Sequence, residues 1–191
     1  MVEHQLPKLG VEGSSPFARS SFPKEGRRVM IASLMMYRRD ELDGAHHRFW
    51  GLIRQRFMAA GINAPLKLSQ NAEEFSVWTA HDLVLSQTCG MPYRTRLHHQ
   101  VRLVGTPDYG LDGCPAGYYR SAIIVRSDDK RDDLSVFADA RFAFNQTLSQ
   151  SGFAAPYWHA QSHGFWFQDR VQMDQHVLSA RAVADGRADI A

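Results

Sequence analysis

Cysteine, net charge and long apolar runs are all scarce in this sequence, and each shortage excludes a class of protein. Two cysteines among 191 residues, Cys89 and Cys114, are too few for a disulfide scaffold, and one bridge or two free thiols both remain open. The formal charge is only +2 with acidic and basic residues interleaved, so there is no basic stripe for nucleic acid. No apolar run reaches the length of a membrane span. We therefore expect neither a nucleic-acid partner nor a membrane span.

Motifs that hold cofactors or metals are also missing. The sequence has no Walker-type phosphate loop and no dinucleotide glycine fingerprint. Its histidine pairs, His46-His47 and His98-His99, are sequence neighbours. Neighbours in a helix point about 100° apart and do not share a face, so these pairs do not form a zinc site. We predict no metal and no cofactor.

The first 28 residues are rich in Pro, Gly and Ser and have no hydrophobic periodicity, which predicts a disordered leader over residues 1–28. They also lack the basic-then-apolar plan of a secretory signal peptide. Met30 stands directly before the first apolar run and is a candidate for the true start of the protein.

The next part of the chain alternates between strand and helix patterns. An uncharged apolar run over residues 29–37 predicts a buried strand. A helix then starts at residues 40–43, with Asp43 a candidate N-cap, and ends at Gly61. Further along we predict strands at 66–68, 82–87 and 101–104, with short helices at 73–78 and up to Leu97.

A loop with four glycines and two prolines covers residues 105–117. After it we predict strands at 118–125 and from Arg141, a short helix at 132–139, and a helix ending at Gly164. An extended segment at 165–173, a helix at 176–184 and the start of a strand at 188–191 complete the pattern. This order predicts an α/β protein with mostly parallel sheets. Because the sequence stops as a strand begins, we expect the protein to continue beyond Ala191.

A polar segment at residues 145–152, here called the elbow, connects the strand from Arg141 to the following helix. A strand that passes through Ser, Thr and Gly into a helix leaves free backbone N–H groups at the helix N-terminus. With the helix dipole and the hydroxyls, these groups make an anion-binding site. The alternative is a plain helix N-cap, since Ser is a preferred capping residue.

Ligands of open α/β sheets lie beyond the C-terminal ends of the strands, so the residues that follow each predicted strand are candidates for binding. They supply hydroxyl, amide and imidazole groups and no carboxylate, which suits phosphate, phosphite, phosphonate or sulfate. The candidates are Tyr37, Thr88, Tyr93, Ser149, Gln150, Ser151 and His176. For a tyrosine at a strand end the alternative is a place in the core or at its rim, and for His176 a helix cap or surface position.

Enzyme readings remain as alternatives. Ser149, His176 and Asp189 are the residue types of a nucleophile triad, yet Ser149 lacks the Gly-x-Ser-x-Gly elbow. Cys89 with a histidine is a second candidate nucleophile. Neither spacing selects a particular partner.

From about Val29 to Ala191 the chain resembles the phosphate, phosphite and phosphonate substrate-binding proteins of ABC transporters. Three segments carry the resemblance: DLVLSQTCGMPY, then YYRSAIIVRSDD with DDLSVFADARFAFNQTLSQSG, and finally QHVLSARAVADGRADIA. The family has the type 2 periplasmic-binding-protein fold, in which a ligand lies between two α/β lobes. The resemblance therefore implies a two-lobed type 2 fold and a role in transport rather than catalysis.

Carried onto this sequence, the family's Ser-x-Ser elbow falls on Ser149, Gln150 and Ser151. Its usual middle residue is Thr, so Gln150 is a departure that can change the choice of ligand. The family's Gly-Ser-His motif falls on His176, preceded here by Asp174 and Gln175. An inward-pointing Asp174 would repel a dianion. Tyr37 and Tyr93 fall where contacts from the first lobe are expected.

The resemblance implies a first, incomplete lobe at 29–107, a hinge or linker at 108–118 and a second lobe at 119–191 that includes the start of a return crossing. The implied function is capture of a small oxyanion in the interlobe cleft for uptake, with an ABC-transporter permease as partner. Periplasmic localisation follows from the family, whereas the missing signal peptide allows a cytoplasmic one. The alternatives are a cytosolic small-molecule sensor on the same fold and a hydrolase that uses Ser149 or Cys89.

Overall fold

The computed structural model describes residues 30–70 and 72–191, and the leader predicted at 1–28 lies outside them. The strands are β1 (Ile31–Ser33), β2 (Leu83–Ser86), β3 (Phe142–Phe144) and β4 (Arg170–Gln172). The α-helices are α1 (Asp43–Ala59), α2 (Glu74–Trp78), α3 (Gly90–Pro92), α4 (Ala155–Ser162) and α5 (His176–Ala184). Single turns of 3₁₀-helix, η1 (Asp40–Leu42) and η3 (Leu134–Phe137), and of π-helix, η2 (Tyr93–Leu97) and η4 (Gln150–Ala154), complete the described elements.

The strands form two separate parallel pairs. β1 pairs with β2, and β3 pairs with β4. Helices lie between the paired strands along the chain, as a parallel connection requires. The mixed helix and strand content with short parallel sheets confirms the α/β class and the parallel arrangement predicted from the sequence.

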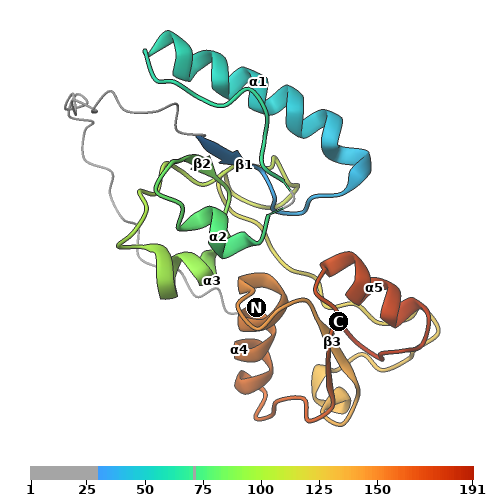
Figure 1. Cartoon of the computed structure of the whole chain (residues 1–191). Helices are drawn as coiled ribbons and strands as arrows, with labels where there is room; N and C mark the ends of the chain where they lie inside the picture. The colour runs from blue at the N-terminus through green and yellow to red at the C-terminus, as the bar shows by residue number, and fades with distance from the viewer. Residues whose placement is uncertain (1–29, 71) are drawn as a thin grey trace.

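Each face of the β1–β2 sheet packs against a different helix (Figure 1). Ala32 and Leu34 pack with Trp50 of α1, which is only 2% exposed. Ile31 and Leu83 belong to a second apolar cluster that includes α2. Alternate residues of a strand point to opposite faces, so the uncharged run of β1 buries both of its sides.

The start of α1 differs from the prediction at Asp43. Leu42, not Asp43, is the N-cap. The Asp43 carboxylate lies in the first turn of α1 and accepts hydrogen bonds from Arg38 Nε at 3.0 Å and Arg38 Nη2 at 2.9 Å. A carboxylate there also complements the positive end of the helix dipole. The predicted end is confirmed, since Gly61 follows the helix with a φ of 71°.

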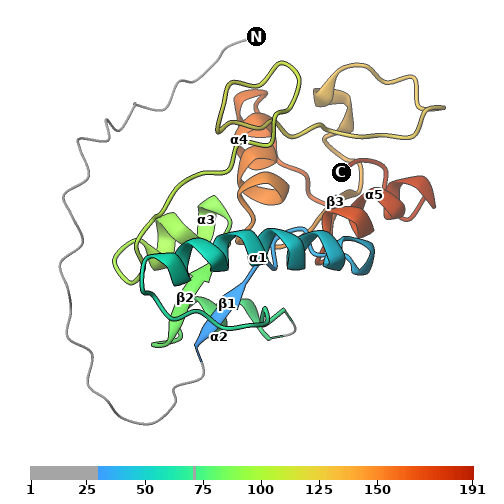
Figure 2. The ribbon, with the colours of Figure 1, turned by 90° about the horizontal axis from the view of Figure 1, so that it is seen from above.

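The β3–β4 sheet lies between α4 and α5 (Figures 1 and 2). Phe142 and Phe144 pack with Ala160 of α4, and the intervening Ala143 packs with Ala182 of α5. The C-terminal segment continues the sheet, because the backbone N–H of Ala143 donates to the carbonyl of Ile190 at 2.8 Å. Ile190 in turn forms an antiparallel bridge with Val125. The C-terminal end of β3 is therefore fixed by α4 on one face, by α5 on the other and by β4 and Ile190 at its edges.

Three predicted strands are wrong. Residues 66–68 and 101–104 are irregular, and of 118–125 only Val125 forms a bridge. Leu66 is 74% exposed and Val104 81%, so these segments do not bury an apolar face as a strand would. Ser69 N–H donates to the Ala32 carbonyl of β1 at 2.7 Å, but residues 66–68 do not extend this contact into a ladder. The predicted loop at 105–117 is confirmed as irregular. Within the described residues, no helix is both long and apolar enough to cross a membrane.

Candidate functional site

The elbow begins with a serine that caps the turn after it. The backbone N–H of Gly152 donates to the Ser149 hydroxyl at 3.0 Å, and Ser149 is 5% exposed. Its carbonyl then accepts from the N–H of Ala154, which produces the π-helical turn of η4. Such turns occur often at functional sites. Ser149 is therefore the helix N-cap that the sequence offered as the alternative to an anion-binding residue.

Ser151 has a different environment from Ser149. Its Oγ lies 3.1 Å from Nε2 of His176, the first residue of α5, and the serine is 8% exposed. Asn145 Nδ2 lies 3.3 Å from the same ring nitrogen. An amide nitrogen only donates, so Nε2 accepts and the imidazole is neutral with its proton on Nδ1. Burial favours the same state, because it lowers the pKa of His176.

Gly152 allows the close approach of these groups. A Cβ at this position would lie 1.9 Å from Asn145 Oδ1 and 3.1 Å from His176 Cε1. Only glycine leaves room for both side chains against the elbow. The Oδ1 atom of Asn145 is buried and has no hydrogen-bond partner within the described residues.

Two tyrosines approach Ser151 from other parts of the chain. Tyr37 follows β1 with a φ of 58°, unusual for a bulky residue, and its ring centroid lies 5.9 Å from that of His176. Burial, with a smaller contribution from Tyr119, raises the pKa of Tyr37 to about 12, and the Ser151 hydroxyl opposes this shift. Burial likewise raises the pKa of Tyr119. At neutral pH both phenols therefore keep their protons and remain donors.

Gln150 connects the elbow to the segment after β2. Arg94 Nη2 donates to Gln150 Oε1 at 2.6 Å, and the N–H of Gln150 donates to Cys89 Sγ at 3.2 Å. A Cβ on Gly90 would lie 3.5 Å from Gln150 Cγ, an ordinary contact distance. The elbow thus contacts both the residues after β2 and those of α5.

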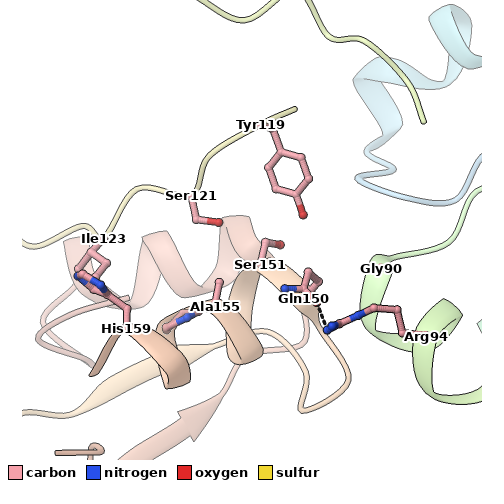
Figure 3. Close-up of a pocket in the computed structure, with 10 residues that line it drawn as sticks. Gly90, Arg94, Tyr119, Ser121, Ile123, Gln150, Ser151, Ala155 and His159 are labelled. Atoms are coloured by element: carbon pink, nitrogen blue, oxygen red, sulfur yellow. Dashed lines mark hydrogen bonds between the residues drawn. The ribbon is translucent and has the colours of Figure 1, made fainter. Parts of the chain in front are cut away.

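Two neighbouring cavities open at these residues. The smaller, of about 300 Å³, is lined by Tyr37, Asn145, Gly152 and His176 among others. The larger, of about 740 Å³, is lined by Arg94, Gln150 and His159 among others. Ser151 and Tyr119 line both, and Figure 3 shows the Tyr119 hydroxyl directed toward Ser151.

The structure gathers four of the seven predicted site residues around these cavities: Tyr37, Gln150, Ser151 and His176. It does not bring the other three there. Ser149 is the cap; the Thr88 hydroxyl donates to the Cys89 carbonyl at 3.4 Å; and Tyr93 packs in the apolar cluster around α2. Their roles in binding stay predictions.

Residues 84–191 match a family model described as "ABC transporter, phosphonate, periplasmic substrate-binding protein". The chain belongs to this family. The matched residues run from β2 to the end of the chain and include the elbow and His176, so the resemblance seen in the sequence is confirmed. A search of curated proteins finds no match. Tyr37 lies before the matched residues, in the part of the chain that contains β1 and α1.

Charge in the site suits the substrate class that this family's description names. None of the described residues that line either cavity is Asp or Glu, whereas Arg94 and Arg120 are among them. Asp174 does not line either cavity; its Oδ1 accepts from Gln172 Nε2 at 2.7 Å. In the part of the chain that the structure describes, no group of three His, Cys, Asp or Glu residues is placed to hold a metal ion.

The residues suggested for a catalytic triad have other partners. Ser149 caps η4, His176 Nε2 lies against Ser151 and Asn145, and Asp189 Oδ2 accepts from the N–H of Arg141 at 2.9 Å. The family consists of substrate-binding proteins of transporters rather than enzymes. The separate partners of Ser149, His176 and Asp189 agree with a binding protein.

Sequence reasoning missed Tyr119, Arg94 and Asn145. Tyr119 lies within residues predicted as a strand, and Arg94 within a short basic helix, where a charge usually faces solvent. Asn145 is the first residue of the elbow, directly after β3, and its place at a strand end is the signal that could have made it a candidate.

Proposed function

We propose that this chain is a solute-binding protein that captures a small oxyanion of the phosphate, phosphite or phosphonate class for ABC-type uptake. The observation that carries the proposal is the convergence of Ser151, His176 and Tyr37 on one cavity whose described lining includes no Asp or Glu side chain. Neutral donors of this kind bind an anion through hydrogen bonds without a full positive charge.

The hydroxyls of Tyr37 and Tyr119 donate to the oxyanion. The Ser151 hydroxyl has one proton, which it turns from His176 Nε2 to the oxyanion when the ligand binds. His176 is neutral and accepts from Asn145 Nδ2, and its position fixes the side chain of Ser151. Gln150 offers its amide group at the rim. The Ser149 hydroxyl holds the turn that presents Gln150 and Ser151, and its own proton remains available to a ligand.

In this proposal the protein has a two-lobed type 2 fold, with a first lobe at 29–107, a linker at 108–118 and a second lobe at 119–191. The ligand contacts both lobes only when they close on it, so binding shifts the population toward the closed state. The closed form then delivers the oxyanion to a permease. Proteins of this family are typically periplasmic, and we propose the same compartment for this chain.

A thermal-shift screen tests the proposal. Phosphate, phosphite, sulfate and methylphosphonate are added separately at millimolar concentration, and any that binds the native state raises the unfolding midpoint. We expect at least one phosphorus oxyanion to raise it. The double variant Ser149→Ala/Ser151→Ala should lose the shift while still unfolding cooperatively. A flat response of the unmodified protein to all four anions would refute the proposal.

A further inference from the structure

The two cavities are neighbours that share part of their lining. Five described residues line both of them: Tyr119, Ser121, Ile123, Ser151 and Pro156. A water molecule takes about 30 Å³ in the liquid, so a five-atom oxyanion needs on the order of 100 Å³. The smaller compartment of about 300 Å³ holds such an anion with room to spare. The larger one, of about 740 Å³, has the size of a site for an organic group.

The walls of the larger compartment combine apolar and polar groups. Ala155 and Pro156 of α4, together with Ile123, supply apolar surface. Figure 3 shows Arg94 with Gln150 at one end and His159 beside Ile123 at the other, with Ser151 and Tyr119 between them. An oxyanion near Ser151 would therefore leave space for a substituent on either side.

Charge in this space favours one kind of substituent. Arg94 lies at the rim of the larger compartment and Arg120 in the lining of the smaller, and the described lining residues include no carboxylate. Arg94 Nη2 donates to Gln150 Oε1 at 2.6 Å and to Met91 Sδ at 3.6 Å. Arg94 forms no ion pair with any carboxylate of residues 30–70 and 72–191. A guanidinium has five N–H donors, so most of its capacity remains for a ligand.

We propose that the organic substituent of a phosphonate bound at Ser151 occupies the larger compartment, and that Arg94 selects a substituent with an acidic end over one with an amino end. The inference rests on the proposed function and specifies its substrate class. An ammonium in this compartment would meet Arg94 and find no carboxylate in the described lining, whereas a carboxylate would pair with Arg94.

The test compares phosphonates that share one head group. Isothermal titration calorimetry of the full chain uses methylphosphonate, propylphosphonate, 3-phosphonopropionate and 3-aminopropylphosphonate. We expect propylphosphonate and 3-phosphonopropionate to bind more tightly than methylphosphonate. We also expect 3-phosphonopropionate to bind about tenfold more tightly than the amino compound, because its carboxylate pairs with Arg94 whereas the ammonium is repelled by Arg94.

Arg94→Gln should reduce the ratio of the two affinities to about threefold or less. The remaining preference for the carboxylate compound would come from Arg120 and the rest of the site. The matched control is Arg96→Gln, since Arg96 lies on the same helical turn but stacks over Phe75 at 5.0 Å and lines neither cavity. It should keep the ratio of the unmodified protein. Thermal melts of both variants verify that they fold.

A second variant tests the compartment independently of charge. Ala155→Leu places a larger side chain in the larger cavity and should weaken propylphosphonate at least fivefold more than methylphosphonate. The inference is overturned if methylphosphonate binds as tightly as the substituted compounds, or if the amino and carboxylate compounds bind equally. Failure of every oxyanion to bind, methylphosphonate included, would instead overturn the proposed function.

Discussion

Two serines that lie two positions apart in the elbow have separate tasks. The Ser149 hydroxyl accepts from the N–H of Gly152 and begins the turn, while Ser151 Oγ contacts His176 at the cavity. Ser149 is therefore structural and we propose that Ser151 binds ligand, although both are serines of one turn. Their hydrogen-bond partners distinguish the two roles.

Single alanine variants should separate these tasks. Ser149→Ala removes a cap and should lower the free energy of unfolding by about 1 kcal/mol, with a modest loss of affinity. Ser151→Ala should weaken oxyanion binding at least tenfold, about 1.4 kcal/mol, and change stability less. Urea unfolding and calorimetric titration measure the two effects. Equal affinity in Ser151→Ala and the unmodified protein would contradict this assignment.

His176 should make stability depend on pH in the mildly acidic range. Burial lowers its pKa below the 6.5 of the unfolded chain, so the unfolded state binds a proton first as the pH falls. The contribution is fully present above pH 6.5 and is lost as the pH falls from there toward the folded-state pKa. Carboxylates with lowered pKa values, such as Asp43 and Asp129, act in a more acidic window.

Urea unfolding at a series of pH values from 8 to 5 measures this effect. The free energy of unfolding should fall below pH 6.5 in the unmodified protein and fall less in His176→Gln. Parallel pH profiles for the two proteins would show that burial of His176 does not depress its pKa.

At the scale of elements, β3 is the centre of its sheet. Phe142 is 1% exposed and stacks on Phe167 with ring centroids 4.6 Å apart, while Ala143 packs against α5 on the other face. The end of this strand supports the elbow, so packing of β3 positions the site.

Phe142→Ala should therefore cost about 3–5 kcal/mol of unfolding free energy, the range for a buried aromatic residue that leaves a cavity. Trp158→Ala is the matched control, because Trp158 on α4 is 72% exposed and its loss should change stability by about 0.5 kcal/mol or less. Chemical denaturation of both variants provides the comparison. Similar stability losses in the two would contradict the central place of β3.

Apolar patterns in the sequence predicted several elements close to their observed bounds. Helix α5 was predicted with its observed bounds, and α2, β2 and β3 within one or two residues. The strands predicted at 66–68, 101–104 and 118–125 failed because an apolar run does not reveal whether a partner strand will lie beside it. In place of a ladder, the Gln70 side chain accepts from the N–H of Leu34 at 2.8 Å.

For the molecule as a whole, the rule that ligands lie beyond strand ends located Tyr37, Gln150, Ser151 and His176. It could not give the contacts between segments far apart in sequence. Arg94 reaches Gln150, 56 positions along the chain, and Tyr119 reaches Ser151 from an irregular segment. Such contacts depend on tertiary packing, which no local pattern encodes.

Our central claim is that one oxyanion is held jointly by Tyr37, in the segment after β1, and by Ser151, which His176 at the start of α5 positions. The most direct measurement is a calorimetric titration of methylphosphonate into three proteins: the unmodified chain, Tyr37→Phe and His176→Gln. Tyr37→Phe removes only a hydroxyl, and His176→Gln alters the group that positions Ser151. We predict saturable binding at one site in the unmodified chain and at least a tenfold loss, about 1.4 kcal/mol, in each variant. Absence of binding to the unmodified chain, or unchanged affinity in either variant, would contradict the claim.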